Sequence, residues 1–104
     1  MQKYMIDISK EAKADIKNII MYIKDILLEP IIAKKYSKLI KENINSLNYS
    51  PERFAVIDSE LIKGKIYRKL VIRNYIAIYR IDTENNKVHI VRVLYGRRNF
   101  ENIL

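Results

Sequence analysis

Basic and aromatic residues interleave in two stretches of the second half of the chain, residues 67–80 and 90–100. All seven arginines lie at or after Arg53, whereas nine of the thirteen lysines lie in the first half. An arginine guanidinium is a planar fork that can grip a phosphate or carboxylate through two parallel hydrogen bonds, and a lysine ammonium cannot do this. The chemistry expected of the second half is therefore binding of phosphate or carboxylate groups.

An arginine doublet, Arg97 and Arg98, follows Gly96 directly after the last predicted strand. From a strand end both side chains can reach an anionic group without deforming the sheet, so we interpret the doublet as functional. The full set of arginines predicted to bind a target or nucleic acid is Arg68, Arg73, Arg92, Arg97 and Arg98.

Other residues that could carry chemistry have structural interpretations. Tyr75 and Tyr79 alternate with Ala77, which indicates that they pack against a half-buried sheet. His89 is the only histidine and lies within a predicted strand, so we interpret it as a strand residue rather than a general base.

Composition limits the possible classes of protein. The 104 residues, 49% of them hydrophobic, suit a single domain over residues 1–104 with one core. There is no cysteine and only one histidine, so no metal or other cofactor is expected. No apolar run is long enough to span a bilayer and residues 1–10 do not resemble a secretion signal, so we expect a cytoplasmic protein. The net charge of +8 predicts a polyanionic partner, either nucleic acid or an acidic protein, with simple solubility as the alternative.

Two helices are expected to follow a short strand at residues 4–8 in the first half of the chain. Ser9 is a suitable N-cap, and Glu11 is placed where the helix dipole favours a negative charge. Pro30 fits the first turn of the second helix, so the two helices form a hairpin joined near residues 28–30. Apolar residues recur at helical spacing along both helices, at positions 12, 16, 19, 20, 23, 27 and 32, 36, 39, 40, 44, 47.

Three strands are expected in the second half, at residues 66–72, 75–81 and 88–95, after a loop over 48–64 that the pattern does not assign. Short turns between them, the first at Arg73-Asn74, predict an antiparallel meander. The order of elements is β-α-α-β-β-β, an α+β fold with the helical hairpin packed on one face of a small, mainly antiparallel sheet. The other face is left for solvent or a partner.

These features resemble the RelE/ParE superfamily, the toxins of type II toxin–antitoxin systems, over essentially the whole chain. The pattern that carries the resemblance is an arginine-bearing strand (68–70), the Asn74-Tyr75 turn, an isoleucine/tyrosine strand (76–80) and the run Arg-Val-Leu-Tyr-Gly-Arg-Arg at 92–98. The resemblance implies a toxin that inhibits growth and that a cognate antitoxin holds silent by wrapping around it, within a hetero-oligomer.

The superfamily has two activities, and the residues favour the second. RelE-like members are ribosome-dependent mRNA endonucleases, whereas ParE-like members act on DNA gyrase and have no known hydrolytic site. In RelE-like members an arginine follows the tyrosine that opens the third strand, and here that residue is Ile76. The tail, residues 99–104, lacks the tyrosine of RelE-like members, and its hydrophobic end resembles the short terminal helix of ParE-like members. We therefore favour a gyrase-directed toxin of a plasmid-stabilisation system.

Two alternatives stay open. If the chain is instead a ribosome-dependent endoribonuclease, and so an enzyme, the resemblance implies that Arg98 contacts phosphate and Tyr95 acts as the acid. Lys69, or alternatively Arg68, then matches the basic strand residue. The second alternative is a non-toxic basic module that binds nucleic acid.

The expected antitoxin surface is a basic groove on the sheet, flanked by the two helices. Such a groove suits an acidic amphipathic helix or an added strand, and ion pairs there would speed association and set specificity. Ile76, Leu94 and Phe100 are predicted to supply the apolar contacts to the antitoxin.

Overall fold

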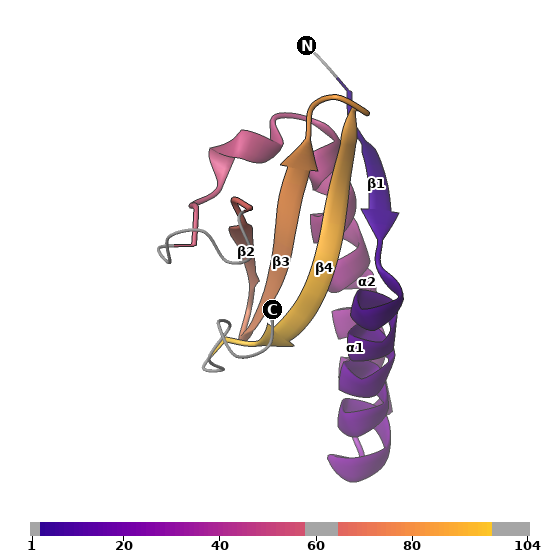
Figure 1. The fold of residues 1–104 in the computed structure, drawn as a ribbon. Coiled ribbons are helices and arrows are strands. Elements are labelled where there is room, and N and C mark those ends of the chain that lie inside the picture. The colour runs from indigo at the N-terminus through magenta and orange to yellow at the C-terminus, as the bar shows by residue number, and fades with distance from the viewer. Residues whose placement is uncertain (1–2, 58–64, 97–104) are drawn as a thin grey trace.

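The computed structural model describes residues 3–57 and 65–96 (Figure 1). The elements in chain order are β1 (Met5–Ile8), α1 (Lys10–Met21), the π-helical turn η1 (Tyr22–Ile26), α2 (Pro30–Asn45), the 3-10 turns η2 (Ser46–Asn48) and η3 (Pro51–Arg53), β2 (Arg68–Ile72), β3 (Tyr75–Asp82) and β4 (Lys87–Tyr95). This confirms the predicted α+β fold and its order of elements. The predicted short terminal helix lies outside the described residues. No helix in the described part has the length and apolar character needed to cross a membrane.

The sheet has the strand order β1-β4-β3-β2. Strands β2, β3 and β4 form the antiparallel meander that the short turns predict, and Arg73 adopts a left-handed conformation (φ 58°) in the turn between β2 and β3. Strand β1 pairs in parallel with β4, from Met5 opposite Lys87 to Ile8 opposite Ile90. The first and last strands of the described part of the chain are therefore neighbours, which the local sequence pattern does not reveal.

A β-bulge interrupts the pairing of β3 with β4. Ile78 lies opposite Arg92 and Tyr79 lies opposite Ile90, so Val91 is an extra residue in β4. Val88 and Ile90 before the bulge, and Val93 after it, all contribute to the core beneath the helices. The bulge thus changes the phase of alternation, so that both parts of the strand present apolar side chains to the same layer.

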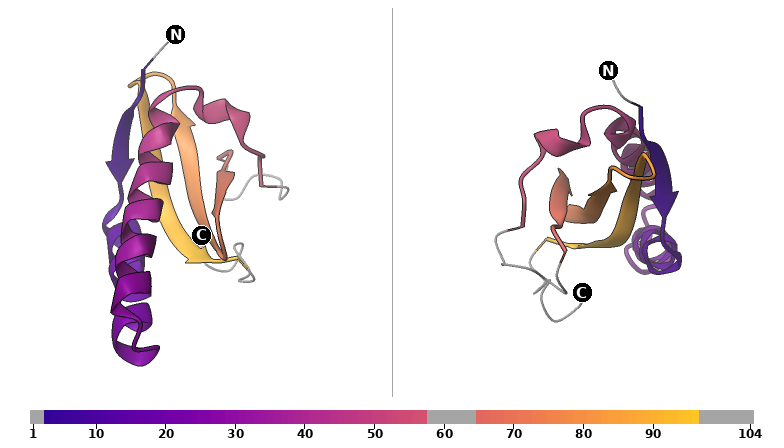
Figure 2. Two further views of the ribbon diagram at one scale, coloured as in Figure 1. Left: turned by 180° about the vertical axis from the view of Figure 1, so that it is seen from behind. Right: turned by 45° about the horizontal axis from the view of Figure 1, so that its top comes forward.

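The helical hairpin covers one face of this sheet (Figures 1 and 2). Ser9 is the N-cap of α1, since its Oγ accepts a hydrogen bond from the Ala12 N–H at 2.9 Å, and Pro30 occupies the first turn of α2, as predicted. The main core between helices and sheet consists of the buried residues Tyr4, Ala12, Ile40, Ile44, Leu47, Leu70, Ile72, Ala77, Tyr79, Val88, Ile90 and Val93.

The opposite face of the sheet is less open than the sequence predicts. Tyr67, Ile76, Ile78 and Leu94 form a second buried cluster there. Residues 55–57 run beside the start of β2, where Ile57 N–H donates to the Tyr67 carbonyl at 2.8 Å and Lys69 N–H donates to the Ala55 carbonyl at 3.0 Å. This added segment turns part of the expected partner surface into a second small core.

Candidate functional site

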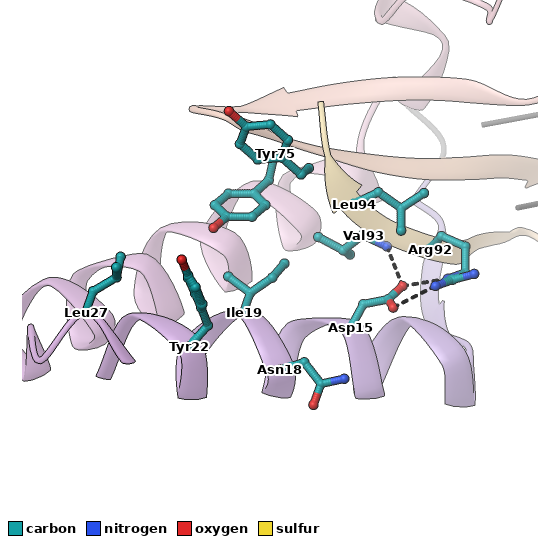
Figure 3. Close-up of a pocket in the computed structure, with 10 residues that line it drawn as sticks. Asp15, Asn18, Ile19, Tyr22, Leu27, Tyr75, Arg92, Val93 and Leu94 are labelled. Atoms are coloured by element: carbon teal, nitrogen blue, oxygen red, sulfur yellow. Dashed lines mark hydrogen bonds and ion pairs between the residues drawn. The ribbon is translucent and has the colours of Figure 1, made fainter. Parts of the chain in front are cut away.

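An open groove of about 780 Å³ lies between the distal half of the first helix and the end of β4 (Figure 3). Helix residues form one wall and strand residues form the other. The groove is lined by Asp15, Asn18, Ile19, Tyr22, Leu27, Tyr75, Arg92, Val93, Leu94 and Tyr95.

A charged pair closes one end of the groove. Asp15 on α1 accepts hydrogen bonds from Arg92 Nε at 2.7 Å and Nη2 at 2.9 Å, and also from the Val93 N–H at 3.0 Å. The hydrogen bond to Asp15 raises the pKa of Arg92 above its ordinary value. Because this guanidinium fork is already filled by a carboxylate, the geometry favours a role for Arg92 in joining helix to sheet over the predicted role in target binding.

The other end of the groove is lined by tyrosine rings. The Tyr75 ring lies edge-to-face against Tyr36 of α2, with centroids 5.8 Å apart, and against Tyr95, with centroids 6.0 Å apart. Burial, and then the neighbouring tyrosines 36, 22 and 95, raise the pKa of Tyr75. This end of the groove therefore offers apolar ring surface together with phenol hydroxyl groups.

Of the other predicted binding arginines, the structure describes Arg68 and Arg73. Arg68 Nη1 donates to the backbone carbonyls of Glu52 at 3.0 Å and Phe54 at 2.7 Å, which holds the loop after α2 against β2. Arg73 is exposed in the β2–β3 turn. Arg97 and Arg98 lie outside the described residues.

Of the residues expected for ribonuclease chemistry, the structure describes Lys69 and Tyr95, and it does not bring these two together. Tyr95 lies opposite Tyr75, and Tyr75 opposite Ile72, on the face that packs against the helices. Lys69 is the neighbour of the core residue Leu70, so alternation places it on the other face. Lys69 and Tyr95 therefore belong to opposite faces of the sheet.

Two of the predicted antitoxin contacts have little surface to offer. Ile76 is 8% exposed and Leu94 is 4% exposed, because both belong to the second buried cluster. An antitoxin would reach them only if their neighbours moved, although Leu94 contributes to the groove wall. Phe100 lies outside the described residues.

The interpretation of Tyr79 as a packing residue is confirmed, and His89 also has structural partners. Tyr79 is fully buried and its hydroxyl donates to the Pro51 carbonyl at 2.5 Å, and burial raises its pKa to about 12. His89 lies between two carboxylates, with Nδ1 2.9 Å from Asp7 and Nε2 3.1 Å from Asp82. Hydrogen bonds, first from Asn85 and then from His89, lower the pKa of Asp82 to about 2.

The His89 arrangement is a cross-strand clamp. A carboxylate only accepts hydrogen bonds, so both contacts are made together when both ring nitrogens carry protons. The clamp joins β1, β3 and β4, which supports the interpretation of His89 as a strand residue. Within residues 3–57 and 65–96, no three histidine or acidic side chains are grouped so that they could hold a metal ion.

Sequence reasoning missed the helix side of the groove, chiefly Asp15, Tyr22 and Leu27. Leu27 belongs to the predicted apolar stripe, and the stripe continues past the point where the sheet can cover it. That surplus length was the signal available. Asp15 gives no local signal, because its partner Arg92 lies 77 residues away in the chain.

The two-helix layer on a four-stranded sheet with strand order β1-β4-β3-β2 is a RelE/ParE-like fold. Similar solved structures bear this out. A chain of the "Chromosomal ParDE TA system from P. aeruginosa" is 21% identical with a TM-score of 0.72, covering 89% of this chain and 96% of that one. The archaeal RelE–RelB complex from Pyrococcus horikoshii OT3 gives 18% identity and a TM-score of 0.64, covering 94% of this chain and 100% of that one. The complex RelBE2 from Mycobacterium tuberculosis gives 24% identity and a TM-score of 0.60, covering 91% and 93%.

The family model described as "ParE toxin of type II toxin-antitoxin system, parDE" matches residues 6–100. The chain therefore belongs to the ParE toxin family, on the branch that the sequence favours. No curated protein matches it.

Proposed function

We propose that this toxin acts by binding DNA gyrase and does not cut mRNA on the ribosome. The observation that carries the proposal is the match to the ParE toxin family over residues 6–100. The position where RelE-like members carry an arginine is Ile76 here, and that side chain is buried and apolar. It can neither donate a hydrogen bond nor stabilise charge on a phosphate.

The described geometry supports binding over catalysis. Cleavage of RNA through the 2′-hydroxyl needs a proton carrier and cationic donors around one phosphate. Lys69 and Tyr95 belong to opposite faces of the sheet, and Arg92 is engaged by Asp15. A toxin that blocks its target by binding needs none of these residues to converge.

The proposal also includes the antitoxin. A cognate acidic antitoxin would silence the toxin in the cytoplasm by placing an apolar segment in the groove, within a hetero-oligomer. The groove offers the rings of Tyr22, Tyr75 and Tyr95, a type of surface enriched in binding hot spots. The net charge of +8 favours an acidic partner and fast association with it.

Gyrase assays test the choice of target. Added to gyrase and relaxed plasmid, the toxin is expected to inhibit supercoiling and to accumulate cleaved DNA, while mRNA from cells expressing it stays uncut by primer extension. A Tyr95→Phe variant should be equally toxic, because only the hydroxyl is lost. Absence of any gyrase effect, together with in-frame cuts in translated mRNA, would overturn the proposal.

A matched pair of tyrosine variants tests the antitoxin groove. Tyr22 in the groove and Tyr49 outside it are similarly exposed, at 47% and 45%. Tyr22→Ala is expected to weaken antitoxin binding about 30-fold in calorimetry, as for a hot-spot tyrosine, whereas Tyr49→Ala leaves it within about twofold. Equal affinities for the two variants would exclude the groove as the docking site.

A further inference from the structure

The tip of the helical hairpin carries an exposed apolar patch that lies outside the groove except for Leu27, which lines both. We define this hairpin-tip patch as Met21, Ile26, Leu27, Leu28, Ile31 and Ile32, which are 38–76% exposed. These six account for nearly half of the thirteen exposed large hydrophobic side chains in the described part of the chain, although they fall within twelve consecutive residues. The hairpin extends beyond the end of the sheet, so the sheet does not cover them (Figures 1 and 2).

The backbone at the tip is unusual in two ways. Leu28 has a positive φ of 55°, a conformation that is costly for a residue with a Cβ, and its side chain is 76% exposed. The preceding turn, Tyr22–Ile26, is a π-helix, a form that is rare and is often found at functional sites. Within one copy of the chain, exposed Leu28 gains little packing to offset its strain. A partner seated on the tip would supply that packing.

Charge indicates what kind of partner fits. Residues 21–32 carry one lysine, Lys24, against Asp25 and Glu29, a net charge of −1, so the rest of the chain carries +9. The tip is therefore a poor surface for nucleic acid, which needs positive charge. Two copies that meet tip to tip bring nearly neutral surfaces together and keep their basic sheets at opposite ends.

Area is adequate for such a contact. The patch exposes on the order of 700 Å² on each copy, close to the roughly 800 Å² that each partner contributes to a standard specific interface. A patch of this size exceeds the few hundred Å² usual on soluble monomers. A two-fold axis through the tips would let the same residues serve both sides. We propose that the chain free of antitoxin forms a homodimer through the hairpin-tip patch.

Sedimentation of the full chain over about 1–100 µM, a range that brackets a micromolar Kd, tests this proposal. The wild type should reach twice the chain mass of 12.4 kDa. A Leu28→Asn, Ile31→Glu variant should stay monomeric, with dimerisation weakened at least about 100-fold. Asparagine tolerates positive φ, and glutamate is favoured in the first turn of a helix, so the variant should fold normally by circular dichroism.

Met5→Gln is the matched control, because Met5 is 69% exposed and lies on β1, away from the tip. It should dimerise like the wild type. A wild type that stays monomeric over the whole concentration range would overturn the proposal. If addition of antitoxin then protected the tip from hydrogen exchange, the patch would be a binding site for the antitoxin. Unchanged dimerisation of a folded tip variant would equally overturn it. Toxicity enters none of these readouts, so the result stands independently of the proposed function.

Discussion

The base and the tip of the helical hairpin are both rich in apolar residues, but only the base has a layer to pack against. At the base, Ile40, Ile44 and Leu47 are at most 1% exposed against the sheet, whereas Ile31 at the tip is 72% exposed. Helical periodicity is similar at both ends, so the pattern shows which side of a helix is apolar and does not show what covers it. The difference separates apolar residues that hold the fold from apolar residues free to bind something else.

Truncating one isoleucine at each end gives the largest expected contrast. Ile44→Ala should lower the free energy of unfolding by about 2–5 kcal/mol, because it leaves a cavity in the main core. Ile31→Ala should change it by less than about 0.5 kcal/mol, since the side chain is already in water. Urea denaturation at a concentration where the chain is monomeric measures both. Similar losses at the two sites would show that the tip is also packed.

Removing the carboxylate that joins α1 to β4 should have the next largest effect. Asp15→Ala leaves Arg92 and the Val93 N–H without their acceptor, and should cost about 1.5–3 kcal/mol as for hydrogen bonds to charged groups. Asp25→Ala, an exposed acid near the tip, should cost less than about 0.5 kcal/mol. Thermal unfolding followed by circular dichroism compares the two. A cost for Asp15→Ala no larger than that for Asp25→Ala would mean the pair contributes nothing to stability.

The Ser9 cap at the base of the hairpin is expected to contribute less to the free energy of unfolding than the Asp15–Arg92 pair. Ser9→Ala should cost about 1 kcal/mol, because the Ala12 N–H loses its side-chain acceptor. The same substitution at exposed Ser37, inside α2, should be neutral or slightly stabilising, since alanine is the better helix former. Chemical denaturation of both variants checks the sign of each change. Loss of stability at Ser37 and none at Ser9 would contradict the assignment of the cap.

The smallest expected effect has the opposite sign and lies at the tip. Leu28→Gly relieves a left-handed backbone conformation that costs the folded state roughly 1–2 kcal/mol. Glycine also loses more chain entropy on folding, which lowers the free energy of unfolding by about 0.5–1 kcal/mol. The monomer should therefore gain between zero and about 1.5 kcal/mol, with a midpoint of about 0.75 kcal/mol, seen as a small rise in Tm. A loss of more than about 1 kcal/mol would indicate that Leu28 packs within a single copy.

Much of the fold could be predicted because its signals are local. Ser9 and Pro30 mark helix starts by their own chemistry, and Arg73-Asn74 marks a turn between two β-branched runs. The toxin family was also predictable, because its pattern lies within short continuous segments that the sequence displays directly.

What escaped prediction depends on residues far apart in the chain. The parallel pairing of β1 with β4 and the contact of Asp15 with Arg92 both join the first twenty residues to the last twenty. Residues 55–57, which help convert the open face into a second core, carry no strong pattern of their own. The groove forms only when these distant segments are brought together, so its helix wall could not be predicted from either half of the sequence alone.

The bulge at Val91 has a consequence for how this protein can change over time. Ser9 donates its backbone N–H to the Ile90 carbonyl and its hydroxyl to the Val91 carbonyl, each at 2.9 Å, so the extra residue in β4 meets the residue that starts α1. The extra residue in β4 and a serine 82 positions earlier in the chain are thus structurally coupled. Loss of the serine would deprive the Val91 carbonyl of its hydroxyl donor, and loss of the bulge would deprive the hydroxyl of that acceptor, so we expect lineages to keep or to lose them together.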